Sequence, residues 1–169
     1  YDYTREHTGA AHKAWMATLP GHIRLTLGER RVLLVHGSPR RINEFLWSST
    51  TPTPFVERLL RDHDTDVVAC THTGLHWSRL QDGARGVVNV GALGRPANDG
   101  RTCVWFTILE AADGRVNVEF VPVEYDHGRL GREMHDEGLP GEFVDTLHSG
   151  YWTTCLEALP AKERARGRF

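Results

Sequence analysis

The sequence predicts an α/β (α+β) protein in which mixed β-sheets are flanked by helices. Short apolar runs bounded by Gly, Pro, Asn and Asp recur through the middle of the chain, as is typical of strands joined by tight turns. Stretches with apolar residues at helical spacing lie before and after these runs. A chain of 169 residues is long enough for one domain with a substantial core. We therefore expect a single domain over residues 1–160 and a basic, mobile tail over residues 161–169.

The first third of the chain predicts one helix followed by a hairpin. Residues 4–19 carry apolar side chains at near-helical spacing and end at Pro20-Gly21, so we expect one amphipathic helix. Residues 23–27 alternate between apolar and polar, and residues 31–35 return after a Gly-Glu turn. The five tryptophans share no loop and are predicted to be packing anchors.

The rest of the chain predicts a helix, a meander of strands and two closing helices. A helix starting near Phe55 follows a Ser/Thr/Pro-rich loop over residues 48–54. The expected strands are 67–70, 76–80, 86–90, 103–110 and 115–123, with turns at 82–83, 98–100 and 113–114. The expected closing helices are 125–137 and 142–148.

Two of these strands end in a histidine. Residues 32–35 are four branched apolar residues followed by His36, Gly37 and Ser38, and residues 67–70 lead in the same way to His72. Neither run alternates with polar residues, so both strands are expected to be buried on both faces. Each histidine alone fits a hydrogen-bonded strand-end residue. Because loops converge at the carboxyl ends of strands, two such histidines on one sheet predict a metal or phosphate site, with their ring nitrogens close together.

Composition narrows the classes of partner and compartment. The chain has 20 Lys and Arg residues and 22 Asp and Glu residues, so its net charge is −2. This balance gives no electrostatic reason to expect a nucleic acid or a membrane surface as partner. Three scattered cysteines form no zinc or disulfide pattern, so we expect a reducing, cytoplasmic location. No apolar run reaches the roughly 20 residues that span a bilayer. The sequence starts at Tyr1 without methionine, so we expect a processed or trimmed chain or the latter part of a longer one.

Three loops carry a family resemblance. In chain order, the first loop is His36-Gly37-Ser38-Pro39 and the second is Thr71-His72-Thr73-Gly74. The third is the segment 89–96, which begins with Asn89 and contains Gly94-Arg95-Pro96. Together they resemble the C-terminal half of calcineurin-like metallophosphoesterases, which show His-Gly, then Gly-His-x-His, then Asn-x-Gly-Ser with Gly-x-Pro behind it. The resemblance implies the metallophosphoesterase-like αββα sandwich, with its N-terminal part missing from this sequence.

The resemblance also implies a chemistry. In that family the two matching histidines share one metal ion with an asparagine and a bridging aspartate, and the corresponding positions here are His36 and His72. The implied cofactor is a divalent metal, Mn first, with Fe, Zn or Ni as alternatives. The implied activity is hydrolysis of a phosphate ester, by a phosphatase or phosphodiesterase, through a metal-activated water. Arg95 is a candidate for binding a substrate phosphate oxygen, or else a surface ion-pair partner.

The sequence departs from the family pattern in ways that keep a second interpretation open. Gly74 stands where the family has its last histidine, and His76 either supplies that imidazole or is a surface strand histidine. The family's Asp-x-His, Gly-Asp and Gly-Asn-His motifs are expected before Thr4, outside this sequence. The alternative function is therefore a non-catalytic binding or scaffold module that retains the phosphoesterase fold. Asn89 and its glycines either pack against the metal loops or form backbone turns.

Overall fold

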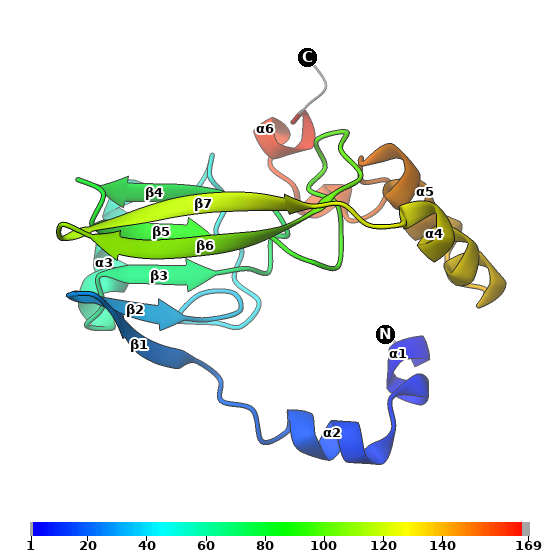
Figure 1. The fold of residues 1–169 in the computed structure, drawn as a ribbon, viewed down its shortest axis with the longest axis horizontal. Helices are drawn as coiled ribbons and strands as arrows, with labels where there is room; N and C mark the ends of the chain where they lie inside the picture. Colours follow the sequence, from blue (N-terminus) through cyan, green and yellow to red (C-terminus); the bar gives the residue numbers. More distant parts are fainter. Residues whose placement is uncertain (1, 167–169) are drawn as a thin grey trace.

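The fold is built on a five-stranded mixed sheet (Figure 1). The computed structural model describes residues 2–166. The strands are β1 (Ile23–Leu27), β2 (Arg30–Leu34), β3 (Val67–Cys70), β4 (Trp77–Gln81) and β5 (Arg85–Asn89), in the order β1-β2-β3-β5-β4. The central strands β2, β3 and β5 are parallel, and β1 and β4 are antiparallel edge strands. All three parallel strands therefore direct their carboxyl ends to the same edge of the sheet.

The apolar strand β3 explains this topology. All four of its residues are buried, as predicted for a run without polar alternation, and it lies between β2 and β5. The predicted meander is therefore wrong, because a strand buried on both faces takes a central, parallel position. In β2 the prediction holds only for its first part: Val32 and Leu33 are buried, but Leu34 and Val35 are half-buried because the neighbouring edge strand β1 is largely exposed.

Each face of the sheet has its own cover, so the predicted mixed sandwich flanked by helices is confirmed. The hairpin of β6 (Val104–Ala112) and β7 (Arg115–Val123) covers one face, and α3 (Thr53–Asp62) covers the other. On the hairpin side the buried cluster is formed by Val32, Val67, Ala69, Val88 and Val116. On the helix side it is formed by Leu46, Val56, Leu59, Leu60, Val68, Cys70, Trp77 and Val87.

The C-terminal third folds back on the carboxyl edge of the sheet. Its elements are α4 (His127–Asp136), α5 (Gly141–Ser149), the 3-10 turn η1 (Leu156–Ala158) and α6 (Ala161–Arg164). Within the predicted basic tail, residues 161–164 form α6 with Glu163 buried, where its carboxylate accepts a hydrogen bond from the Ser49 amide at 2.9 Å. Residues 167–169 of the predicted tail lie outside the described residues. The domain boundary at residue 160 stays a prediction.

The predicted turn at residues 98–100 does not join two paired strands, because β5 and β6 belong to different sheets. Asn98 is buried with φ of 55°, and its side chain holds the C-terminal segment. Its Oδ1 accepts from the Trp152 amide at 2.9 Å, and its Nδ2 donates to the Glu163 carbonyl at 3.1 Å. An Asn-Asp-Gly sequence that signals a hairpin locally is used here for long-range anchoring.

The N-terminal segment differs from the single amphipathic helix predicted over residues 4–19. It forms two short helices, α1 (Asp2–His7) and α2 (Ala10–Met16), separated by Gly9 in an extended conformation. Neither helix buries a residue, and Trp15 is 61% exposed, whereas the other four tryptophans are buried in the core. In residues 2–166 no helix is both long and apolar enough to cross a lipid bilayer.

Candidate metal centre

The carboxyl ends of β2 and β3 bring two imidazoles together. Backbone pairing continues past both strands, since the Val35 amide donates to the Ala69 carbonyl at 3.0 Å and the Thr71 amide to the His36 carbonyl at 2.9 Å. His36 Nε2 then lies 3.0 Å from His72 Nδ1, with the two rings inclined at 64°. The prediction that these ring nitrogens approach each other is confirmed.

A buried asparagine fixes the loop that carries His72. Asn89, the last residue of β5, is fully buried and donates from Nδ2 to the Thr71 carbonyl at 3.1 Å. Its Oδ1 accepts from the Gly91 amide at 3.4 Å, while the Thr71 hydroxyl donates to the Gly91 carbonyl at 2.6 Å. His72 itself has φ of 64° in the left-handed region, a strained conformation for a residue with a side chain. Asn89 and Gly91 therefore hold the loop in a shape that it would not adopt alone.

The surroundings of His72 favour a neutral imidazole. Burial lowers its pKa, and a positive charge on His36 would lower it further, whereas a hydrogen bond with the Asn43 backbone acts in the opposite direction. A neutral imidazole is the form that binds a metal ion. Phe45 stacks on the ring at a centroid distance of 4.3 Å. Sequence reasoning missed Phe45, because the segment around it lacks regular periodicity.

The pair fits part of a metal centre. Two nitrogens that each bind an ion at about 2.1 Å lie about 3.0 Å apart if the ion is octahedral and about 3.4 Å apart if it is tetrahedral. The observed 3.0 Å between His36 and His72 matches neighbouring ligands of an octahedral ion. Among residues 2–166, no group of three or more His, Cys, Asp or Glu side chains is placed to hold a metal ion. The two histidines are thus a half-site that needs further ligands.

His76, the possible third imidazole, lies elsewhere. It is buried against Trp105 and Phe120, at centroid distances of 4.0 and 4.9 Å, and Arg166 Nη2 approaches its Nε2 at 3.1 Å. Burial, followed by the charge of Arg166, lowers the pKa of His76 to about 4. The alternative of a surface strand histidine is wrong, because the β6–β7 hairpin and the C-terminal segment cover this position.

Gly74, which stands where the resemblance expects a histidine, packs against the buried indole of Trp152. It has φ of 69°, and a Cβ atom there would lie 3.3 Å from Trp152 Cζ2. A larger side chain would therefore meet both backbone strain and the buried indole.

Arg95 is half-buried, and its contacts are with the C-terminal segment. Its guanidinium lies 4.0 Å from the Trp152 ring centroid, and Nη2 donates to Thr154 Oγ1 at 3.2 Å and to the Thr154 carbonyl at 3.3 Å. Burial lowers its pKa. Nε is buried without a hydrogen-bond partner in the described part of the chain. Its role in substrate binding stays a prediction.

Comparison with known proteins supports the fold assignment. No family model matches the sequence, and no curated protein matches it. The structure is similar to a hypothetical protein from Pyrococcus horikoshii OT3, with a TM-score of 0.72 and 22% identity over 89% of this chain and 59% of that one. It is also similar to a metallophosphoesterase from Sphaerobacter thermophilus, with a TM-score of 0.67 and 24% identity over 88% of this chain and 66% of that one.

The chain has a metallophosphoesterase-like fold. It spans only 59% and 66% of the lengths of these two proteins. The likeness therefore shows the fold, and the chemistry of the site has to be argued from the residues at the sheet edge.

Proposed function

We propose that this chain contributes part of the active site of a metal-dependent phosphoesterase. The observation that carries the proposal is the 3.0 Å approach of His36 Nε2 to His72 Nδ1 at the carboxyl edge of parallel strands. Bound there, a divalent ion such as Mn²⁺ would bind a phosphate oxygen and lower the pKa of a water molecule.

The chain's own residues have defined parts in this proposal. His36 and His72 hold the ion, and the amide of Asn89 keeps the His72 loop in place. The remaining ligands, carboxylates above all, come from polypeptide beyond residues 2–166, because two imidazoles alone offset none of the charge of a divalent ion. Arg95 belongs to the same proposal as a contact to the phosphate, on the chemistry of its guanidinium alone.

One observation favours the alternative, a non-catalytic binding or scaffold module of the same fold. Residues 2–166 assemble no cluster of three or more metal-binding side chains, and Gly74 cannot accept a larger side chain without meeting Trp152. A protein that used this fold only to bind a partner would need its surface residues but no complete set of metal ligands.

Hydrolysis of bis(p-nitrophenyl) phosphate with Mn²⁺ separates the two functions. We expect the 169 residues alone to show little or no metal-stimulated hydrolysis. A chain extended upstream through its reading frame is expected to be active if that frame encodes Asp-x-His, Gly-Asp and Gly-Asn-His. His36→Ala in the active form should then remove at least about 99% of turnover.

A matched control is His12→Ala, since His12 is exposed on α2. It should leave turnover unchanged. Robust hydrolysis by the short chain would contradict the need for further ligands. An extended chain that is folded, carries those motifs and is inactive would favour the scaffold function.

A further inference from the structure

A basic cavity opens beside His36. It has a volume of about 330 Å³ and lies between the start of β1, the loop over residues 37–42 and the end of α3. Its charged and titratable lining consists of Arg24, Arg40, Arg41, His22, His36 and His63. No carboxylate from the described residues lines it. A cavity with three guanidiniums and no carboxylate is suited to an anion.

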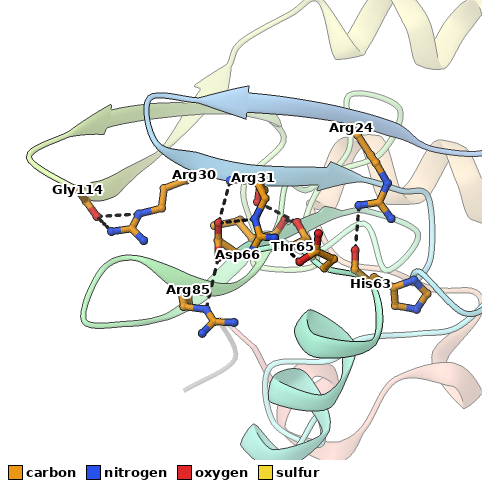
Figure 2. A network of polar contacts seen from close by, with 10 residues as sticks. Arg24, Arg30, Arg31, His63, Thr65, Asp66, Arg85 and Gly114 are labelled. Atoms are coloured by element: carbon orange, nitrogen blue, oxygen red, sulfur yellow. Dashed lines mark hydrogen bonds and ion pairs between the residues drawn. The ribbon is translucent and has the colours of Figure 1, made fainter.

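The positive charge in this cavity is poorly compensated. Arg24 Nη1 donates to the His63 carbonyl at 2.9 Å, which orients the guanidinium without neutralising it (Figure 2). The Arg41 side chain has no hydrogen bond or ion pair to any residue in the range 2–166. Within residues 2–166, Arg40 alone of these three arginines forms an ion pair, with Glu44 at 3.8 Å. Two of the three guanidiniums thus have no carboxylate partner in the described chain.

The loop that presents Arg40 and Arg41 is held by its own hydrogen bonds. Ser38 Oγ accepts from the Arg40 and Arg41 amides at 3.0 and 3.2 Å, and the Ser38 amide donates to the Arg41 carbonyl at 2.9 Å. A Cβ atom on Gly37 would lie 2.5 Å from the Ile42 carbonyl oxygen, so only glycine permits this closure. A loop ordered in advance lowers the cost of binding a ligand.

We propose that this cavity binds a phosphate group next to the one held at the histidine pair, so that the ligand of the site carries a diphosphate or longer chain. His36 lines the cavity and also faces His72, which places the two positions side by side. A diphosphate oxygen set accepts bidentate hydrogen bonds from guanidiniums at Arg24 and Arg41. The assignment of this ligand as a substrate rests on the proposed function, but its binding does not.

Calorimetric titration of the 169-residue chain with inorganic pyrophosphate, in EDTA and at low salt, tests the proposal. We expect pyrophosphate to bind at least tenfold more tightly than inorganic phosphate. Arg24→Gln and Arg41→Gln should each weaken pyrophosphate binding about tenfold, the loss of one charged hydrogen-bond donor. Arg41→Gln is the safer variant for folding, because the Arg41 side chain makes no hydrogen bond or ion pair within the described chain.

Two control variants separate this cavity from other sources of binding. Arg115→Gln removes the same charge at the tip of the β6–β7 hairpin, by the far end of the sheet, and should leave the affinity unchanged. His72→Ala removes a proposed metal ligand that does not line the cavity, and should also leave metal-free binding unchanged.

The outcomes distinguish this inference from the proposed function. Loss of pyrophosphate binding in His72→Ala, with Arg24→Gln and Arg41→Gln unaffected, would overturn the inference by placing the anion at the histidine pair. Pyrophosphate binding that neither Arg24→Gln nor Arg41→Gln weakens would also overturn it. Retained pyrophosphate binding in a chain that never shows metal-dependent hydrolysis would support the cavity while the phosphoesterase proposal fails. ADP binding as tightly as pyrophosphate would identify the diphosphate alone as the recognised group, and tighter ADP binding would add a nucleoside contact.

Discussion

The two ends of the parallel strands both carry arginines, but these arginines have a carboxylate partner at the amino ends and none among the described residues at the carboxyl ends. At the amino ends of β2, β3 and β5, Asp66 lies between two arginines (Figure 2). Its Oδ2 accepts from the Arg31 amide at 3.0 Å and from Arg31 Nε at 3.2 Å, and Arg85 Nε lies 3.7 Å from its Oδ1. At the carboxyl ends, His36 and His72 face each other with no carboxylate beside them among the described residues, and Arg24 and Arg41 have no carboxylate partner there either.

The difference shows which end is structural and which is available to a ligand. A carboxylate surrounded by donors stabilises the native state and leaves nothing for a partner to bind. Guanidiniums without a carboxylate partner are suited to an anion, and two imidazoles that face each other are suited to a metal ion. The contrast agrees with the general location of ligand sites at the carboxyl ends of parallel strands.

The largest expected loss of stability comes from a substitution at the amino ends of the parallel strands. Asp66→Ala leaves the amide and guanidinium of Arg31 without their mostly buried partner, so the free energy of unfolding should fall by about 2–4 kcal/mol. Urea denaturation followed by circular dichroism measures the change. The control is Asp64→Asn, which removes the charge of a carboxylate that is 85% exposed and contacts the same arginine, keeps a residue that tolerates the left-handed backbone at φ of 46°, and should cost under about 1 kcal/mol. Similar losses from both variants would break the comparison.

The same carboxylate predicts an acid dependence. Hydrogen bonds from Arg31 hold the pKa of Asp66 below its usual value of 3.8. The unfolded chain therefore takes up this proton first as the pH falls, so the contribution of Asp66 is complete well above pH 3.8 and is lost as the pH falls through the lower, native pKa. Asp66→Asn should be less stable at neutral pH and lose less stability on acidification. An unchanged difference between the two proteins from pH 6 to pH 2 would contradict this assignment.

At the carboxyl end, Asn89→Ala should lower the free energy of unfolding by about 1–2 kcal/mol, because it leaves the Thr71 carbonyl and the Gly91 amide without their buried partner. The His72 loop would no longer be fixed, so Zn²⁺ affinity should fall although neither proposed ligand has changed. If Asn89→Ala lost this stability but bound Zn²⁺ as tightly as the wild type, Asn89 would have a structural role only.

The smallest expected change in the free energy of unfolding comes from His76, which is a structural histidine, unlike the pair His36 and His72. Its pKa of about 4 means that the unfolded chain protonates near pH 6.5 while the native protein stays neutral there. Stability should therefore fall from pH 6.5 to about 4 by about 1 kcal/mol, reduced by the solvent in the adjoining cavity. His76→Phe keeps the stacking on Trp105 and should flatten the profile in this range. A profile as steep as that of the wild type would assign the slope to another group.

The sequence predicted the parts of the fold that depend on local pattern. The unbroken apolar run before His72 indicated an interior strand, and the two strand-end histidines were predicted to meet. What it missed depends on contacts between distant residues. Asn98 anchors Trp152, Gly74 packs against the same indole, and the split at Gly9 follows from an N-terminal segment that buries no side chain.

The basic cavity is a further example of what periodicity cannot reveal. Arg24 comes from the edge strand β1, His63 from the end of α3 and Arg41 from a loop without regular structure. Each of these residues alone is typical of an exposed surface position. Only the antiparallel register of β1 with β2, which sets Arg24 opposite Leu33, brings them to the edge that carries His36.

The most direct test of the half-site is a titration of the 169-residue chain with Zn²⁺, a diamagnetic probe, followed by ¹⁵N–¹H NMR of the imidazoles. Of the ten histidines, His36 and His72 should shift first and together, at one ion per chain and with weak affinity, because two imidazoles form an incomplete ligand set. His36→Ala should abolish the shift of His72, whereas His76 should not respond in either protein. Zn²⁺ shifts that start at other histidines, or that persist at His72 in His36→Ala, would contradict the shared site.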